Sequence, residues 1–284
     1  MNVFSDIESI RQFRWNEPIQ AWGLVPTMGF LHEAHMTLVR RSKAENDRTG
    51  VSIFVNPTQF NNPDDLAKYP RNLERDLAML EKEGVDLVWT PTPEIAYPPG
   101  YQTQVTVHTI TQVLEGASRP GHFQGVATVV AKLFNVFQPH RAYFGQKDAQ
   151  QVAVIQQMVK DLNFNIQIIP CATEREKDGL AMSSRNVNLT EAHRKQAVCL
   201  YQALTAAKAA CLSGEKDADK LKEIMAQVIH RAPDARIDYL SVAHAQTLEE
   251  MTVIKGDVLL SMAVFLGNVR LIDNMTVEAG GEST

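Results

Sequence analysis

The feature that most constrains the fold is an alternation of short apolar runs with segments of helical spacing between residues 21 and 169. Apolar runs of strand length fall at residues 21–26, 50–55, 85–89, 142–144 and 166–169. Apolar residues recur at helical spacing at residues 71–83, 126–137 and 148–162. Because parallel strands are joined by such crossover helices, the alternation predicts an α/β fold with a doubly wound parallel sheet. Ligands of such sheets bind at the carboxyl ends of the strands.

The pattern changes after about residue 180. Helices are predicted at residues 190–213 and 220–230, and strands at residues 236–242, 258–264 and 269–272. Helices followed by strands are typical of a small α+β domain, so we expect two domains, residues 1–177 and 178–284, with a hinge within residues 173–185. Residues 90–101 are predicted to form an exposed loop or flap rather than a linker. Residues 279–284 are predicted to be a frayed tail.

Composition sets limits on the function. The chain has 284 residues, of which 44% are hydrophobic and 21% charged, as in ordinary globular proteins. A formal net charge of −5 argues against a nucleic-acid partner, and no apolar run is long enough to span a membrane. Residues 1–16 lack the continuous apolar core of a secretory signal. Three cysteines without a Cys-x-x-Cys pair favour a reducing compartment, so we expect the cytoplasm.

Residues 26–35, Pro-Thr-Met-Gly-Phe-Leu-His-Glu-Ala-His, carry the chemistry of this sheet edge. They follow the first apolar run and open a helical segment, and the first turn of a helix presents unpaired N–H groups and a positive dipole end to phosphates. Gly29 lets the backbone approach a ligand closely. Three residues apart, His32 and His35 can share one face and donate hydrogen bonds to a triphosphate. The alternative is that one histidine caps the turn and the other is a surface residue.

The same run resembles the nucleotide-binding signature of the pantothenate synthetase (pantoate-β-alanine ligase) family, within the nucleotidyltransferases that share a His-x-Gly-His motif. Ala34 stands where that family usually has glycine. The resemblance implies a Rossmann-like nucleotide domain at residues 1–177 and a smaller domain at residues 178–284 that closes over the active site. It also implies that the turn binds ATP through Met28, Gly29, Phe30, Leu31, His32, Glu33, Ala34 and His35. His32 and His35 are implied to be catalytic.

Two further segments offer groups that bind phosphates. Residues 144–148, Phe-Gly-Gln-Lys-Asp, place a glycine and a lysine after a strand, and they resemble the family's Gly-Glu-Lys-Asp segment with Gln146 in place of glutamate. The run Ser183-Ser184-Arg185 reads in isolation as a helix cap and a surface arginine, but it resembles the family's mobile phosphate-binding loop. The resemblance implies catalytic roles for Lys147, Ser183, Ser184 and Arg185. It adds these ATP-binding residues: Gly145, Gln146, Asp148, Glu174 and Met182.

The second substrate is assigned to polar residues that follow other strands. Asn56 and Gln59 lie in a segment after the second apolar run that resembles the family's pantoate-binding loop, and Gln151 matches its pantoate-binding glutamine. Arg119 precedes the long apolar helix and matches a residue near pantoate and β-alanine. Asp76 corresponds to an acidic residue near the magnesium ion, so it is the predicted metal ligand.

The resemblance implies an ATP-dependent, AMP-forming ligase whose partners are ATP, pantoate and β-alanine, with Mg²⁺ as cofactor and a homodimer as the assembly. Pantoate would first be adenylated with release of pyrophosphate, and β-alanine would then displace AMP to give pantothenate.

Three alternatives are weaker. His32-Glu33-Ala34-His35 superficially resembles the His-Glu-x-x-His zinc motif, but its spacing is three rather than four. Another nucleotidyltransferase of the same fold is the main competitor, although the uncharged amides Gln59 and Gln151 favour a hydroxylated carboxylate as acceptor. A nucleotide-binding module without activity is the third possibility.

Overall fold

The computed structural model describes residues 1–278, so the tail predicted at residues 279–284 lies outside the described residues. The chain divides into two compact units. The first comprises Met1–Gln146 and Gln151–Ala172, and the second comprises Lys147–Gln150 and the chain from Thr173 onward. Each unit is built around its own sheet. In the described residues, no helix is both long and apolar enough to cross a membrane.

The first unit contains a six-stranded parallel sheet in the order β1-β4-β3-β2-β5-β6. Its strands are β1 (Asn2–Phe4), β2 (Trp22–Thr27), β3 (Arg48–Ile53), β4 (Leu87–Trp89), β5 (Arg141–Gly145) and β6 (Gln167–Cys171). Its helices are α1 (Ile7–Trp15), α2 (Glu33–Glu45), α3 (Pro63–Lys68), α4 (Leu73–Lys82), α5 (Pro93–Ala96), α6 (Glu115–Ser118), α7 (His122–Phe137) and α8 (Ala149–Asp161) from Gln151 onward, with the short 3₁₀ helix η1 (Pro57–Gln59). A second short 3₁₀ helix, η2 (Gln146–Asp148), begins at the last residue of the stretch Met1–Gln146, and its other two residues belong to the second unit. The fold class predicted from the alternation is confirmed.

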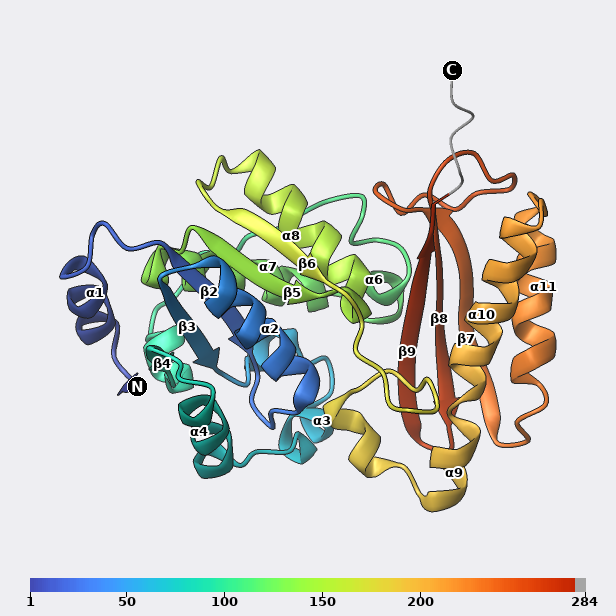
Figure 1. Cartoon of the computed structure of the whole chain (residues 1–284). Helices are drawn as coiled ribbons and strands as arrows, with labels where there is room; N and C mark the ends of the chain where they lie inside the picture. The colour runs from blue at the N-terminus through green and yellow to red at the C-terminus, as the bar shows by residue number, and fades with distance from the viewer. Residues whose placement is uncertain (279–284) are drawn as a thin grey trace. The chain divides into compact units, whose positions relative to one another are not determined.

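Helices cover both faces of this sheet because successive strand residues point to opposite sides. Leu24 and Ala142 pack with the apolar residues of α7 and α8 on one face. Val25 and Tyr143 pack with residues of α2 and α4 on the other face. Figure 1 shows α2 and α7 on either side of the strands. The strands buried on both faces explain the continuous apolar runs of the sequence.

The order of the strands places a switch point beside β2. From β2 the chain proceeds to β3 and β4 on one side and then returns to place β5 on the other side, where Gly23 pairs with Arg141. In sheets of this kind ligands bind where the order reverses, outside the carboxyl ends of the two central strands. The segment that follows β2 therefore begins at the preferred site of the fold.

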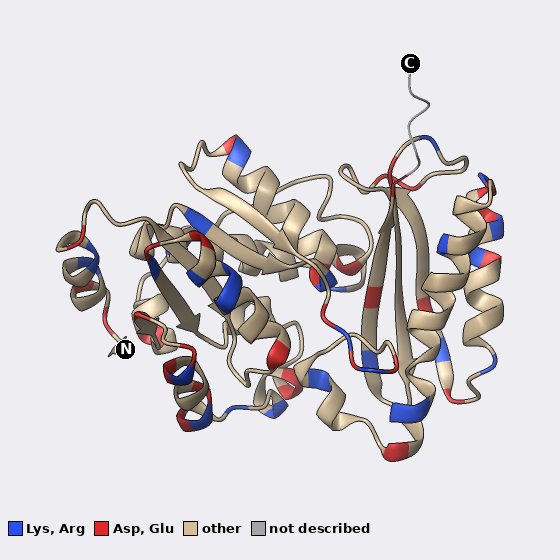
Figure 2. Ribbon diagram, viewed as in Figure 1, with Lys and Arg blue, Asp and Glu red and all other residues tan. Residues whose placement is uncertain are grey.

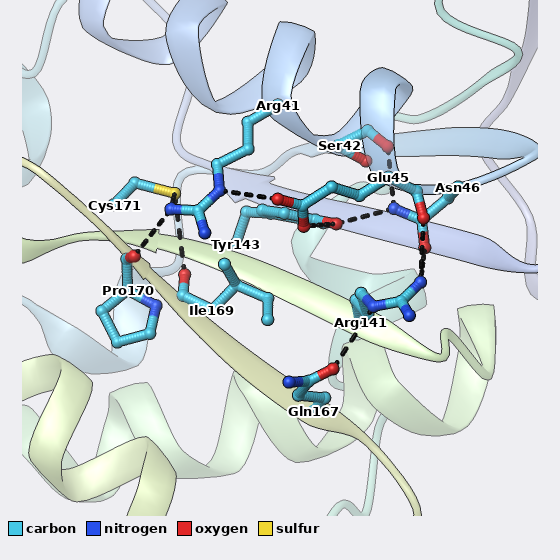
Figure 3. A network of polar contacts seen from close by, with 10 residues as sticks. All are labelled: Arg41, Ser42, Glu45, Asn46, Arg141, Tyr143, Gln167, Ile169, Pro170 and Cys171. Atoms are coloured by element: carbon cyan, nitrogen blue, oxygen red, sulfur yellow. Dashed lines mark hydrogen bonds and ion pairs between the residues drawn. The ribbon is translucent and has the colours of Figure 1, made fainter.

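A network of polar contacts fixes α2 on β5 and β6 (Figure 3). Arg41 donates to Glu45 at 3.0 Å and to the carbonyl of Pro170 at 3.0 Å. The hydroxyl of Tyr143 donates to Glu45 at 2.9 Å and accepts from Asn46 at 2.7 Å. Burial and the neighbouring Glu45 raise the pKa of Tyr143 to about 12, so the phenol stays protonated and can donate. The network holds the helix that carries both histidines.

The second unit is a three-stranded antiparallel sheet, β7-β8-β9, with two long helices against it (Figure 1). Apolar residues of α10 and α11, among them Leu204 and Met225, pack on Leu260 and Val264 of the central strand. Its elements are η3 (Ser184–Asn188), α9 (Glu191–Gln196), α10 (Cys199–Leu212), α11 (Ala218–Ile229), β7 (Ala235–His244), β8 (Val258–Leu266) and β9 (Val269–Val277). Figure 2 shows charges of both signs along α11. The predicted α+β character of this part is confirmed.

Two details differ from the sequence prediction. The single helix predicted at residues 190–213 is wrong, because α9 ends at Gln196 and α10 begins at Cys199. Ala197 and Val198 keep right-handed helical torsions, so an apolar periodicity does not reveal the break. No sequence pattern indicated β1, a strand of three residues that pairs in parallel with β4. Residues 90–101 include α5 and belong to the first unit.

Candidate active site

The chain leaves β2 through a tight turn that ends at α2. Gly29 and Phe30 both have positive φ angles, 84° and 51°. This region is unfavourable for a phenylalanine, so other contacts must hold the turn. A side chain at Gly29 would also lie 3.1 Å from Ile53 and 3.2 Å from Asp76. The glycine that the sequence predicted for close approach is therefore required by the turn itself.

Asp76 is the residue that holds this turn. Its two carboxylate oxygens accept the backbone N–H groups of Phe30 at 2.7 Å and Leu31 at 2.8 Å, and only 1% of the residue is exposed. Asp76 lies in the first turn of α4, where the positive end of a helix dipole favours an anion. Its predicted role as a metal ligand stays a prediction, but the structure gives it a second function as the anchor of the turn.

The two histidines occupy the N-terminus of α2. His32 is the N-cap and His35 lies three residues later, with 4.1 Å between the ring centroids. The backbone N–H of His32 donates to Nδ1 of His35 at 3.2 Å. Because Nδ1 accepts this bond, the proton of a neutral His35 ring lies on Nε2. One histidine is thus a cap, as the simpler interpretation of the sequence proposed, and the other presents an N–H donor.

The other residues of the turn differ in how their side chains are used. The side chain of Glu33 is exposed and pairs with Arg40, so it points along the outer surface of α2. Ala34 is partly buried in the first turn of the same helix. Together with His35 these residues supply the helix N-terminus that attracts phosphate oxygens.

Beyond β3, Asn56 and Gln59 form an amide pair. Nδ2 of Asn56 donates to Oε1 of Gln59 at 3.1 Å, and both residues are buried. Nε2 of Gln59 lies 3.3 Å from the sulfur of Met28, so this pair adjoins the turn that follows β2. The structure thus brings Met28, which the sequence assigned to ATP, next to Asn56 and Gln59, which it assigned to pantoate.

Arg119 and His122 clamp the backbone of the same loop. His122 Nδ1 lies 2.8 Å from the carbonyl oxygen of Gln59, and Arg119 donates to that oxygen at 3.2 Å. At Gly125, the first turn of α7 packs directly on this loop, because an added Cβ would lie 2.5 Å from the carbonyl of Thr58. Gln151, the other predicted pantoate residue, lies partly buried in the first turn of α8.

In the second unit, Lys147 and Asp148 form an ion pair at 3.5 Å within η2, the helix that begins at Gln146 directly after Gly145. The side chain of Asn274 donates to the carbonyl of Lys147 at 2.8 Å. The backbone that carries this lysine is therefore tied to β9.

The segment that carries the Ser-Ser-Arg run begins as a small hairpin. The backbone N–H of Met182 donates to the backbone carbonyl of Glu174 at 2.9 Å, and Gly179, with a φ of 96°, makes the bend. Ser183 then caps η3 by accepting from the N–H of Arg185 at 3.3 Å. The cap predicted by the simpler interpretation is present. It uses an oxygen lone pair of Ser183, so the hydroxyl proton can still be donated to a ligand.

A partly buried ion pair fixes this hairpin, and the sequence did not indicate it. Arg175 binds the carboxylate of Asp273 through two bonds of 2.7 and 3.0 Å and also donates to the carbonyl of Gly179 at 3.0 Å. Its guanidinium lies 4.8 Å from the ring centroid of Tyr201. Asp273 lies in β9, almost a hundred residues further along the chain, so no local pattern joins it to Arg175.

The similarity of the chain to known proteins extends over nearly its whole length. Residues 2–276 match the family described as pantoate-beta-alanine ligase. The chain belongs to this family. A pantothenate synthetase of Acetivibrio thermocellus is 56% identical over 278 residues, which cover 98% of this chain and 99% of the relative. A pantothenate synthetase of Thermotoga neapolitana is 51% identical over 276 residues, which cover 96% of this chain and 99% of the relative.

Solved structures of the ligase family share the fold. The pantothenate synthetase of Thermus thermophilus superposes with a TM-score of 0.92 at 43% identity, and the match covers 97% of this chain and 99% of that one. The pantoate-beta-alanine ligase of Francisella tularensis, complexed with beta-gamma ATP and beta-alanine, matches with a TM-score of 0.81 at 37% identity, and the match covers 100% of both chains. The family resemblance inferred from the motifs is confirmed, and the enzyme class is an acid-amine ligase.

Proposed function

We propose that this chain uses ATP to join pantoate to β-alanine, releasing AMP and pyrophosphate and forming pantothenate. The family match over residues 2–276 carries this proposal. A free carboxylate resists attack by an amine because its leaving group would be oxide, so it must first be activated. The pantoate carboxylate would attack the α-phosphorus of ATP, pyrophosphate would leave, and the amine of β-alanine would displace AMP from the pantoyl adenylate.

The turn from β2 into α2 suits the first step. Negative charge spreads over the phosphoryl oxygens as the bond to pyrophosphate breaks, so preorganised donors lower the barrier. The Nε2–H of His35 and the N–H groups at the start of α2 are such donors. We propose that five more residues stabilise the same negative charge on the phosphoryl oxygens, on the basis of the family motifs: His32, Lys147, Ser183, Ser184 and Arg185. The remaining ATP assignments, including Glu174 and Met182, rest on the same resemblance.

Pantoate is assigned to the amide residues. Gln59 and Gln151 offer uncharged donors and acceptors, which suit hydroxyl and carboxylate oxygens. Asn56 is 1% exposed and both ends of its amide are engaged within the protein, so we propose that it acts on pantoate through Gln59. Arg119 is proposed to act in the same way, by holding the loop that carries Gln59.

Magnesium fits this site as an ion that arrives with the nucleotide. Mg²⁺ in nucleotide enzymes is held chiefly by phosphates, with one or two carboxylates and several waters. Within residues 1–278, no three His, Cys, Asp or Glu side chains group as a metal site. Bound to the triphosphate, the ion would neutralise charge. Asp76 is the carboxylate that the family places near it, and its engagement with the turn restricts it to a supporting contact.

Cellular location and assembly are proposed from the cysteines and from the family. Cys171, Cys199 and Cys211 are unpaired thiols, which supports the cytoplasm as the proposed compartment. Burial raises the pKa of Cys199 to about 11, so this thiol is unreactive at neutral pH. The homodimer and the closing role of residues 178–284 stay predictions from the family.

The direct test measures pyrophosphate release from ATP and Mg²⁺ with pantoate, with and without β-alanine, while AMP and pantothenate are followed in the same samples. The ligase is expected to release pyrophosphate with pantoate and to turn over continuously when β-alanine is added. Release with a different acid or a phosphorylated acceptor alone would instead identify another nucleotidyltransferase. Binding of ATP without release under any condition would identify an inactive nucleotide-binding protein.

His35→Ala and Lys147→Ala are each expected to slow adenylation on the order of 100-fold or more, because each loses a donor to the transition state. Single-turnover pyrophosphate release measures this rate. The matched controls are His230→Ala, at the residue that follows α11, and Lys160→Ala, in the last turn of α8, which remove exposed side chains of the same kinds. Wild-type rates in both test variants would contradict the assignment.

A further inference from the structure

Tyr97 lies in the segment of residues 90–101, to which the sequence assigned no functional residue, yet it contacts the amide pair of Asn56 and Gln59. Its hydroxyl donates to Oδ1 of Asn56 at 2.9 Å. The hydroxyl of Thr58 donates to the same oxygen at 2.9 Å. The other end of the Asn56 amide donates to Gln59 and to the carbonyl of Gly125, both at 3.1 Å. Because Oδ1 faces two hydroxyl donors and Nδ2 faces two oxygen acceptors, the amide of Asn56 can adopt only one of its two flipped orientations.

The orientation of Asn56 determines the orientation of Gln59. Asn56 presents its NH₂ group to Oε1 of Gln59, so the NH₂ group of Gln59 must point away from Asn56. It lies against the sulfur of Met28 at 3.3 Å, and a thioether is a weak acceptor that yields easily to a better one. Gln59 is therefore set to donate to an incoming oxygen atom rather than to accept from a hydroxyl group.

Tyr97 is itself held by the side chains around it. Its ring lies 5.1 Å from that of Tyr101 and 6.3 Å from that of Phe54, measured between centroids. Nζ of Lys132 lies 4.5 Å from the ring centroid of Tyr101 and 5.7 Å from that of Tyr97. Burial raises the pKa of Tyr97, which keeps the phenol neutral and able to donate. The neighbouring rings hold the phenol of Tyr97 in place. Its hydroxyl then reaches the amide pair through the hydrogen bond to Asn56.

We propose that Tyr97 is a positioning residue which, through Asn56, fixes the amide of Gln59 so that it donates to an oxygen of the hydroxy-acid substrate. The proposal rests on the proposed function, because it names the substrate that Gln59 meets. The proposal predicts an effect on one of the three substrates only. Removing the hydroxyl of Tyr97 should weaken the binding of pantoate and leave the nucleotide and the amine unaffected.

The test is Tyr97→Phe, which removes the hydroxyl and keeps the ring. We expect KM for pantoate to rise about tenfold, the effect of losing one hydrogen bond, while KM for ATP and for β-alanine stays within about twofold of wild type. Tyr101→Phe is the matched control, because it removes a hydroxyl from the neighbouring ring without touching Asn56. Thermal unfolding of both variants separates a loss of structure from a loss of positioning.

A double-mutant cycle tests whether Tyr97 acts through Asn56. Asn56→Asp keeps an acceptor for Tyr97 but has no NH₂ group for Gln59, so KM for pantoate is expected to rise in this variant too. Adding Tyr97→Phe to it should then change KM for pantoate by less than about twofold.

Several outcomes would overturn the proposal. They are an unchanged KM for pantoate in Tyr97→Phe, an equal rise for all three substrates, the same rise in Tyr101→Phe, or full additivity in the cycle. If one of these outcomes is found while the wild-type enzyme converts pantoate normally, the role of Tyr97 is refuted and the proposed function still stands. A wild-type enzyme without pantoate-dependent pyrophosphate release refutes both.

Discussion

Residues distant in sequence determine the geometry of the turn at residues 26–35 and of the amide pair of Asn56 and Gln59. The sequence predicted the turn at residues 26–35 and its glycine correctly, because a strand, a glycine and a helix start are local signals. It did not predict that Asp76 holds the turn or that Tyr97 holds the amide pair. Each of these contacts joins segments whose distance in sequence carries no periodic signal, so only the folded chain reveals them.

Asp76→Asn is expected to lower the free energy of unfolding by about 1–3 kcal/mol, because an amide turns an NH₂ group toward one of the two N–H groups that the carboxylate now accepts. Urea unfolding without nucleotide and without Mg²⁺ measures this. Glu74→Gln, an exposed change in the same helical turn, is the control. Unchanged stability together with a shifted Mg²⁺ requirement would show that Asp76 serves the metal alone.

At the scale of elements, most helices and strands follow from periodicity, and the exceptions have physical causes. A strand of three residues such as β1 is too short to show alternation. The hairpin that precedes Ser183 has no apolar periodicity, and it is held by Arg175, Asp273 and Tyr201 instead. The phosphate loop at residues 183–185 stays a prediction from the family resemblance, and the sequence could not indicate the contacts that order the hairpin before it.

Arg175→Lys is expected to loosen this hairpin. A lysine cannot form the two parallel bonds to Asp273, which is 2% exposed and would keep an incomplete set of partners. Amide hydrogen exchange at residues 174–182 should quicken on the order of tenfold, which corresponds to a loss of about 1.4 kcal/mol in local stability. Arg231→Lys, an exposed change, is the control. Unaltered exchange at these residues would show that the ion pair does not order the loop.

For the whole molecule, arginine–carboxylate pairs connect stability to pH. Hydrogen bonds from Arg48 lower the pKa of Glu17, and hydrogen bonds from Arg194 lower that of Asp178. A carboxylate whose pKa is lower in the folded state adds stability above its unfolded pKa and loses it as the pH falls toward the folded value. The unfolded values are 4.5 for Glu17 and 3.8 for Asp178, so the loss begins below about pH 4.5.

We therefore expect the unfolding temperature to vary little between about pH 7 and pH 5 and to fall below about pH 4.5. Scanning calorimetry across this range measures the change. Glu17→Gln should lower stability at pH 7 by no more than about 1 kcal/mol, because the pair with Arg48 is partly exposed, and it should make the acid decline shallower. A protein that became more stable on acidification would contradict the sign of this argument.

The position of β2 in the middle of its sheet has a consequence for synthesis on the ribosome. β2 can pair with β3 as soon as residue 53 has emerged, but its other edge pairs with β5, which begins at Arg141. Until then the nascent chain carries an unprotected strand edge beside the turn that we propose to bind phosphate. A chaperone that covers unpaired edges should therefore bind ribosome-held chains from which Arg141 has not yet emerged. It should release chains from which residue 171, where β6 ends, has emerged.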